Sequence, residues 1–123
     1  MSKSEGDRGA IAKAVFRLFD HWQLEEHEQI ALLGLEDEGQ QRLSTMRAES
    51  LLEATAELNE RALALLRIFR FLGMLFPDHP DLARRWMKTP QPRLDERSAL
   101  DAIKVQGLQG IRRVTVLLEE QLF

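Results

Sequence analysis

Few side chains in this sequence have a type and spacing that could perform chemistry. The three histidines, His21, His27 and His79, follow no metal-binding spacing, and the sequence contains no cysteine. We therefore expect no zinc site, no thiol nucleophile and no disulfide framework. Neighbouring acidic residues such as Glu25-Glu26 and Glu119-Glu120 point in different directions on a helix, so they suit a solvated face better than an acid–base pair. The sequence predicts a protein that is not an enzyme and needs no metal or cofactor.

Nucleotide chemistry is not predicted either. The seven glycines are scattered, and Lys88-Thr89 lacks the preceding glycines of a phosphate-binding loop. Apolar residues make up 44% of the chain, which is too many for a disordered protein, so we expect it to fold. A chain of 123 residues has room for one compact domain or for two very small ones around a shared core.

Charge is distributed unevenly along the chain. Residues 24–47 carry six acidic and two basic side chains, whereas residues 82–113 carry eight basic and three acidic ones. An anionic partner would therefore meet the later segment. Arginine is favoured at interfaces because its planar guanidinium donates several hydrogen bonds. An ordinary solvated surface explains the charge pattern alone equally well.

The start of the chain gives no sign of targeting to a membrane. Met1 to Gly6 are polar and lack the apolar core of a signal peptide. No apolar run approaches the length of a membrane span. We therefore expect a cytoplasmic protein without membrane association.

Helical periodicity begins early in the sequence. Apolar residues at Ile11, Val15, Leu18 and Trp22 predict a first amphipathic helix over residues 8–22. A second helix is predicted over 24–33 and ended by a glycine, and a third over about 36–46. Two short helices around a glycine turn have the outline of a helix-turn-helix.

The helix-turn-helix outline supplies a candidate DNA-binding surface. Four side chains of the third helix could reach bases or phosphates, namely Gln40, Gln41, Arg42 and Arg47. However, Glu36, Asp37 and Glu38 stand at the start of the same helix and would repel phosphates. A helix pair that serves packing alone is therefore the alternative interpretation.

The strongest apolar period lies in residues 51–76. Steps of four and three residues produce one stripe that consists of Leu51, Thr55, Leu58, Ala62, Leu65, Phe69, Leu72 and Phe76. The pattern predicts a helix of about seven turns that Pro77 ends. Further apolar residues at Leu66, Ile68 and Phe71 widen the stripe. This helix should form the centre of the core or of a dimer interface.

Three shorter helices are predicted in the remaining segment. The first covers residues 81–88 with Leu82, Ala83 and Trp86 on its inner face, and Pro90 and Pro92 then favour an extended connection over 89–95. The second runs from a Ser98 cap through Ile103, and Gly107 breaks it. The last covers 108–122, with an apolar side that consists of Ile111, Val114, Leu118 and Leu122.

No strand or hairpin pattern accompanies these helices. The predicted fold is therefore all-α, a small helical bundle. It has an N-terminal part like a helix-turn-helix, a long central helix and a C-terminal helical part.

The second half of the chain resembles a known family. The resemblance is carried by Leu75-Phe76-Pro77-Asp78, Ala83, Trp86-Met87, Pro90, Leu94, Ser98-Ala99-Leu100-Asp101, Gly110 and Val114. These residues are similar to the toxin-binding domain that the Xre, MbcA and ParS antitoxins share. The first half, with Leu32-Leu33-Gly34, resembles the Xre-like helix-turn-helix domain that precedes it. The resemblance implies a helix-turn-helix domain over 1–48 and a toxin-binding domain over 49–123.

Three positions depart from the pattern of the resembled family. That family often has Asn after the loop proline, Gly-Gly after the loop leucine, and proline before the second leucine. This sequence has Gln91, Asp95-Glu96 and Ala99 there. The departures concern the shape of the loop.

The resemblance implies a type II antitoxin whose partner is a RES-domain toxin, an enzyme that degrades NAD. Such antitoxins cover the entrance of the toxin's active site with the C-terminal domain, and some repress their own operon. The partners implied are the toxin and operator DNA. The continuous apolar stripe over 51–76 in addition favours a homodimer or a larger toxin–antitoxin hetero-oligomer. The rival interpretation is a stand-alone transcriptional regulator whose second half only dimerises.

Site residues follow from the resemblance and from the charge pattern. The motif residues are expected to shape the domain, with Trp86 as a core anchor and Asp101 capping or pairing near the start of its helix; they are Trp86, Pro90, Leu94, Ser98, Leu100, Asp101, Gly110 and Val114. The cations expected to contact the toxin are Arg93, Arg97, Lys104, Arg112 and Arg113.

Overall fold

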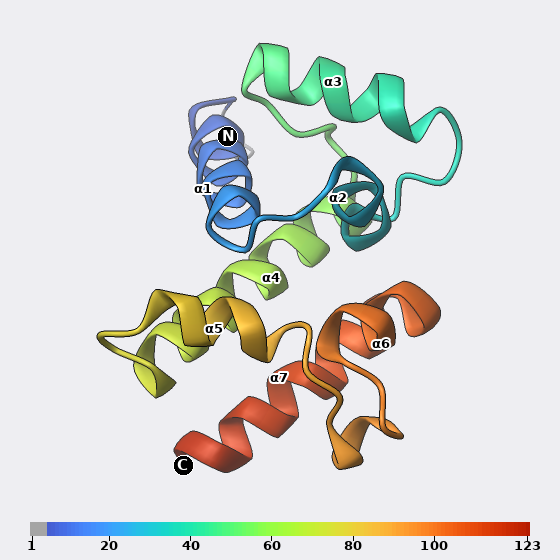
Figure 1. Cartoon of the computed structure of the whole chain (residues 1–123). Coiled ribbons are helices and arrows are strands. Elements are labelled where there is room, and N and C mark those ends of the chain that lie inside the picture. The colour runs from blue at the N-terminus through green and yellow to red at the C-terminus, as the bar shows by residue number, and fades with distance from the viewer. Residues whose placement is uncertain (1–4) are drawn as a thin grey trace.

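A computed structural model describes the backbone of residues 5–123 and the side chains from residue 7 onward (Figure 1). The prediction made on Met1 to Gly6 concerns side chains that lie outside this description. The elements are α1 (Glu5–His21), α2 (Glu26–Leu33), α3 (Gly39–Glu49), α4 (Ala56–Leu75), α5 (Pro80–Trp86), the 3-10 helix η1 (Pro92–Leu94), α6 (Ala99–Gln106) and α7 (Leu108–Leu122). Over these residues the chain forms no strand, only an isolated bridge between Gln91 and Arg97. The all-α prediction is confirmed.

Helix α4 runs through the centre of the molecule (Figure 1). On one side of it lie α1, α2 and α3, and on the other lie α5, α6 and α7. It packs most extensively against α7 and also against α1, while α6 packs against both α7 and α2. The central position predicted for this helix is therefore confirmed.

The central helix is shorter than its apolar stripe predicted. It begins at Ala56, because the Thr55 side chain accepts a hydrogen bond from the backbone N–H of Leu58 and so caps the helix. Residues 51–54 precede the cap and are not helical. The helix ends at Leu75, before Pro77, as expected. A periodic stripe that continues across a cap cannot show by itself where the helix starts.

Other helix ends agree more closely with the sequence. Gly34 ends α2 in the left-handed conformation, with φ 70°, and Ser98 caps α6 by accepting from the N–H of Asp101 at 3.1 Å. The bounds predicted for the last helix are those observed. The third helix starts three residues later than expected, at Gly39, because Glu38 before it adopts a left-handed conformation.

Two details of the α5 region were predicted wrongly. Leu82 is 36% exposed, so the inner face of α5 is formed mainly by the buried Trp86. The connection that follows is not simply extended, since Pro92 opens the single 3-10 turn η1. Proline is compatible with a first helical position because its missing N–H has no partner there.

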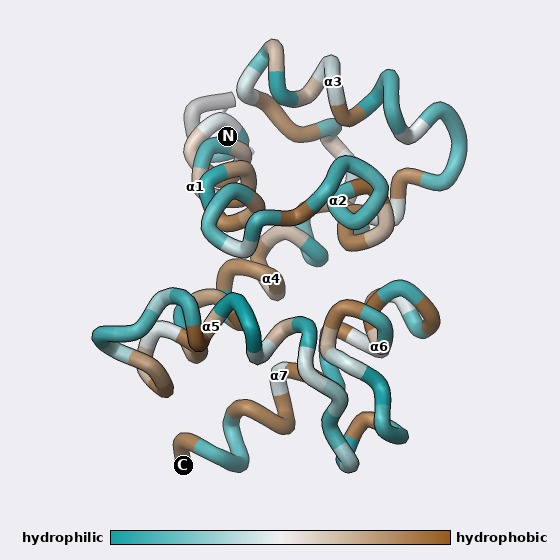
Figure 2. The backbone as a smooth tube through the Cα atoms, in the orientation of Figure 1, coloured by the Kyte–Doolittle hydropathy of each residue, from teal (hydrophilic) through white to brown (hydrophobic). Residues whose placement is uncertain are grey.

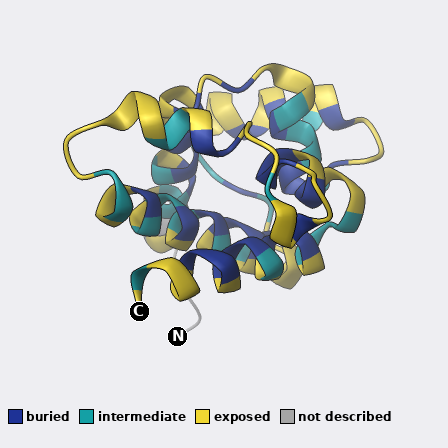
Figure 3. Cartoon of the chain, turned by 60° about the horizontal axis from the view of Figure 1, so that its bottom comes forward, coloured by how far each residue is buried: buried dark blue, intermediate teal, exposed yellow. Residues whose placement is uncertain are grey.

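One hydrophobic core joins the two sides of the molecule. Hydrophobic segments alternate with hydrophilic ones along α4 and α7 (Figure 2), and buried residues line the inward sides of the helices (Figure 3). Leu58, Ala62, Leu65, Ile68 and Leu72 of α4 are all buried in the same cluster as residues of α1, α2, α6 and α7. Phe69 and Phe76 are only half-buried. Because this core is shared, the domain boundary expected between residues 48 and 49 stays a prediction.

A buried arginine links the two sides beside this core. Arg61 of α4 is 8% exposed, and its Nη1 donates to the carbonyl oxygen of Leu32 at 3.1 Å, near the end of α2. Its Nε donates to Glu57 at 3.2 Å. The guanidinium lies so close to Gly34 and Gly107 that a Cβ at either glycine would crowd it. A cation at a helix C-terminus is favourable, since it meets the negative end of the helix dipole.

Candidate functional site

The outer face of α7 forms a groove of about 340 Å³ with the loop that precedes α6. This α7 groove is lined by Arg93, Gln109, Arg112, Arg113, Val116, Leu117 and Glu120. Gln109, Arg112, Val116 and Glu120 recur at steps of three and four residues, so they share one side of the helix. Arg93 comes from η1. Three of the five predicted toxin-contacting cations therefore lie together.

Each arginine of the α7 groove is paired with an acidic side chain of the same chain. Arg93 contacts Glu120 at 2.7 Å and Arg112 contacts Glu60 of α4 at 2.7 Å. Arg113 contacts Asp95 at 3.2 Å. The groove therefore presents alternating charges rather than a purely basic surface. Because exposed pairs contribute little to stability, a partner with charges of both signs could replace them.

The other two predicted cations lie outside the α7 groove. Arg97 is exposed at the end of the loop, where its carbonyl oxygen accepts from the backbone N–H of Gln91 at 3.0 Å. Lys104 lines a different groove, of about 470 Å³, which Arg61 and Gly107 also line. The structure thus separates Lys104 from Arg93, Arg112 and Arg113.

The loop of residues 92–97 contains two consecutive residues in the left-handed conformation. Asp95 has φ 58° and Glu96 has φ 64°. Glycine adopts such angles freely, whereas a side chain disfavours them. These are the two positions that the resembled family often fills with Gly-Gly. The loop of this chain thus has a glycine-type backbone without the glycines.

Arg113 holds the 92–97 loop from α7. Its Nη1 donates to the Asp95 carboxylate at 3.2 Å and to the Gln106 side chain at 3.0 Å, and its Nη2 donates to the carbonyl oxygen of Arg93 at 3.0 Å. The backbone N–H of Glu96 donates to the carbonyl oxygen of Gln91 across the base of the loop. The sequence did not reveal this cluster, because Asp95 and Arg113 are eighteen residues apart.

Comparison with known proteins identifies a family that part of the chain resembles. Residues 72–120 match the family model of the antitoxin Xre/MbcA/ParS C-terminal toxin-binding domain. These residues are therefore similar to the toxin-binding domain of that antitoxin family. The match extends from the last turn of α4 to the last turn of α7 and includes the whole α7 groove apart from Glu60 at its edge. A search of curated proteins found no match to the chain.

The motif residues of the toxin-binding domain mainly shape its core. Trp86, Leu94, Leu100 and Val114 are buried, and the backbone N–H of Leu100 donates to the carbonyl oxygen of Met87. Pro90 is exposed before the loop. Asp101 is exposed in the first turn of α6, where a carboxylate is favoured by the helix dipole.

Gly110 lets α6 and α7 approach closely within the toxin-binding domain. It is buried, and a Cβ there would overlap the carbonyl oxygen of Ala102. This contact lets the first turn of α7 lie directly against α6 after the turn at Gly107. The α7 groove therefore depends on a glycine that does not line it.

The predicted DNA-binding residues on α3 are divided into two kinds. Gln40 and Gln41 are exposed and line a shallow depression with Ser44 and Thr45. Arg42 is bound to Glu53 through two hydrogen bonds of 2.9 and 2.6 Å, and it also donates to the carbonyl oxygen of Asp37. The hydrogen bond with Glu53 raises the pKa of Arg42 and, in the same way, Arg42 lowers the pKa of Glu53.

Arg47 of α3 is also engaged within the chain. Its Nη2 donates to the Gln29 side chain at 2.8 Å, and its guanidinium lies 4.6 Å from the centre of the Phe16 ring. Such a cation–π contact stabilises the position of the arginine against α1. Both cations of α3 would therefore have to break existing contacts before they could meet phosphates.

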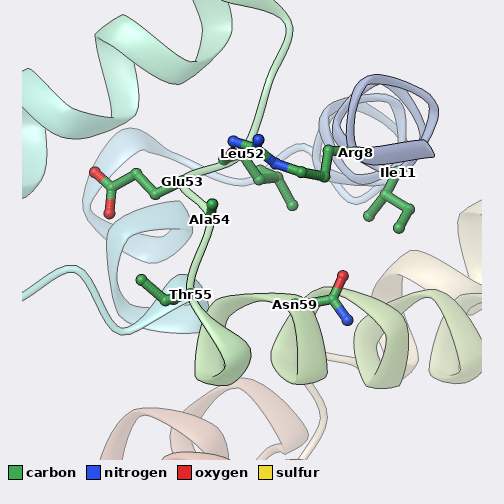
Figure 4. Close-up of a pocket in the computed structure, with 7 residues that line it drawn as sticks. All are labelled: Arg8, Ile11, Leu52, Glu53, Ala54, Thr55 and Asn59. Atoms are coloured by element: carbon green, nitrogen blue, oxygen red, sulfur yellow. Dashed lines mark hydrogen bonds between the residues drawn. The ribbon is translucent and has the colours of Figure 1, made fainter. Parts of the chain in front are cut away.

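A separate pocket of about 300 Å³ lies where α1 meets the start of α4 (Figure 4). Arg8 donates to the carbonyl oxygen of Leu52 at 2.7 Å, and the Glu53 carboxylate points away from Arg8 and Asn59. The polar groups do not converge on a point where a substrate atom could react.

The part of the chain that the structure describes has neither a metal-binding cluster nor a membrane-spanning helix. No group of three or more His, Asp or Glu side chains there is placed to hold a metal ion. No helix among these residues is both long and apolar enough to cross a membrane.

Proposed function

We propose that this chain is a type II antitoxin that binds a RES-domain toxin and stops it from degrading NAD by covering the entrance of its active site. The observation that carries the proposal is the match of residues 72–120 to the toxin-binding domain. The α7 groove within that domain is the contact surface. In this proposal the chain acts as a non-enzymatic inhibitor in the cytoplasm, as a homodimer or within a larger toxin–antitoxin assembly.

The charge pattern of the α7 groove suits such a partner. A site that accepts an anionic dinucleotide offers cations and hydrogen-bond donors. The carboxylates of Glu60 and Glu120, which lie beside Arg112 and Arg93, match such donors. We expect the arginines in turn to meet acidic residues of the partner. Opposite charges on both surfaces give specificity and a fast association more than raw affinity.

Repression of the operon, which some members of the resembled family perform, is expected to be weak for this chain alone. Arg42 and Arg47 are bound to Glu53 and to Gln29, respectively. Glu36, Asp37 and Glu38 are exposed before α3 and would meet the phosphates first. The neutralisation of a toxin is therefore the function that the geometry favours.

The test measures inhibition of NAD degradation by a RES-domain protein encoded beside this gene. The wild-type chain should co-purify with that protein and abolish its NAD turnover at equimolar concentration. The double charge reversal Arg93→Glu/Arg112→Glu should weaken inhibition by about tenfold to hundredfold, because it places like charges against the partner.

A matched control is the double reversal Lys13→Glu/Arg17→Glu on the exposed side of α1. It makes the same change in net charge away from the α7 groove and should inhibit as the wild type does. Full toxin activity in the presence of saturating wild-type chain would refute the proposed function. Equal weakening by both double reversals would show that only net charge matters and would remove the α7 groove as the contact surface.

A further inference from the structure

The three arginines of the α7 groove do not make equivalent contacts. Arg93 and Arg112 have side chains that are 65% and 56% exposed, and their acidic partners lie on α7 and α4. The Arg113 side chain is 35% exposed, and all of its recorded acceptors belong to the 92–97 loop or to Gln106 at the end of α6. Arg113 is therefore directed inward to the loop, whereas the other two are available to a partner.

The 92–97 loop needs such a hold because of its backbone. Two successive non-glycine residues, Asp95 and Glu96, are left-handed. Each disfavours this loop conformation relative to glycine by roughly fivefold or more. Without a compensating contact, the loop would populate other conformations. Two of the three hydrogen bonds of Arg113 supply that contact, one to the Asp95 carboxylate of the strained pair and one to the carbonyl oxygen of Arg93 before it. The third holds the guanidinium on Gln106 of α6.

The loop also determines where Arg93 and Arg97 stand. Arg93 lies in η1 just before the strained pair, and Arg97 follows directly after it. The backbone bonds between Gln91 and Glu96, and between Gln91 and Arg97, close the loop in the conformation in which the pair has left-handed angles. A change at Arg113 would therefore move the candidate contact residues.

We propose that Arg113 is a positioning residue. By binding Asp95, it stabilises a left-handed loop backbone that glycines would adopt without strain. It then affects the toxin only through the 92–97 loop. The inference rests on the proposed function for its effect on a toxin. It is an alternative to the expectation that Arg113 itself contacts the toxin, which stays a prediction. If only a fraction of the molecules has the competent loop, the apparent affinity equals the intrinsic affinity multiplied by that fraction.

A double-mutant cycle on toxin binding separates positioning from direct contact. The variant Glu96→Gly relieves one strained residue and leaves Asp95 in place to bind Arg113. Arg113→Met should weaken binding roughly fivefold to thirtyfold in the wild-type loop. In the Glu96→Gly background the same change should weaken binding several times less. An equal loss in both backgrounds would overturn the proposal, since a direct contact does not depend on loop strain.

The conservative variant Arg113→Lys gives a second, independent distinction. Lysine keeps the positive charge but cannot direct fixed donors to three separate acceptors as a guanidinium does. If Arg113 positions the loop, Arg113→Lys should bind the toxin nearly as weakly as Arg113→Met does. If lysine restored binding to the wild-type level, the toxin would recognise the positive charge at this position directly, and this would contradict the proposal.

A measurement on the free chain distinguishes failure of this inference from failure of the proposed function. Hydrogen exchange of the Gln91 and Glu96 amides, which close the loop, should accelerate by fivefold or more in Arg113→Met, while amides of α4 stay unchanged. Arg112→Met is the matched control and should leave both loop amides at the wild-type rate. Unchanged loop exchange in Arg113→Met would refute the positioning role even if the wild-type chain neutralises a toxin.

Discussion

The Arg61 guanidinium donates to the carbonyl oxygen of Leu32, so that the central helix holds the end of α2. Arg61 is buried, and removing its guanidinium would leave this carbonyl oxygen without its hydrogen-bond donor. It would also leave unfilled space beside Gly34 and Gly107. We expect Arg61→Met to lower the free energy of unfolding by about 2 to 4 kcal/mol. Chemical unfolding followed by circular dichroism measures this loss.

The control for Arg61 is Arg67→Met on the exposed side of the same helix. Arg67 is exposed, so its replacement should change the free energy of unfolding by less than about 0.5 kcal/mol. Losses of similar size in the two variants would show that helix charge, and not the tie to α2, determines the effect.

Two glycines of the chain should respond in opposite directions to alanine. Gly110→Ala places a methyl group against the carbonyl oxygen of Ala102, so α6 and α7 must separate, and we expect a loss of about 3 kcal/mol or more. Gly73 lies within α4 with nothing within 4 Å of an added Cβ. Gly73→Ala should therefore stabilise the chain by about 0.5 to 1 kcal/mol. Thermal unfolding of both variants compares the two signs directly, and a stabilised Gly110→Ala would contradict the close approach of α6 and α7.

The sequence predicted most of the helices because their apolar periods and caps are local signals. Gly34, Ser98 and Pro77 mark ends that the structure places within a residue or two. The predicted starts failed at Leu51 and at the Glu36 to Glu38 segment, where a cap or a left-handed residue competes with the period. Helices α3 and α6 also continue three residues past their predicted ends. The bulky stripe on α4 correctly indicated the centre of the core.

The candidate site was less accessible to sequence reasoning. A count of charges identified Arg93, Arg112 and Arg113, but it gave no indication that each of them is paired with an acid of the same chain. The pair of Arg113 with Asp95 and the separation of Lys104 from the α7 groove depend on how α6 turns into α7 at Gly107. Such long-range geometry leaves no periodic trace in the sequence.

The core of α4 gives a prediction about burial. Leu65 is fully buried, so Leu65→Ala should lower the free energy of unfolding by about 2 to 5 kcal/mol through lost contacts and a cavity. Leu63 is 41% exposed on the same helix, and Leu63→Ala should cost less than about 1 kcal/mol. Urea unfolding of the two variants measures the difference. Equal losses would place both side chains in the same environment, contrary to the packing of α4 between α1 and α7.

The pair of Glu53 with Arg42 predicts how stability depends on pH. The hydrogen bond from Arg42 lowers the pKa of Glu53 below 4.5 in the folded chain, so its contribution is present above pH 4.5 and is lost as the pH falls through the folded value. Both side chains are about a third exposed, and solvent screening limits the contribution to less than about 1 kcal/mol. Glu53→Gln should therefore be less stable than the wild type at pH 7, and the stabilities of the two proteins should converge in acid below the folded pKa.

Unfolding in urea across this pH range, with the exposed Glu49→Gln as control, measures the convergence. A stability difference that stays constant from pH 7 into strong acid would show that the carboxylate charge of Glu53 does not stabilise the loop between α3 and α4.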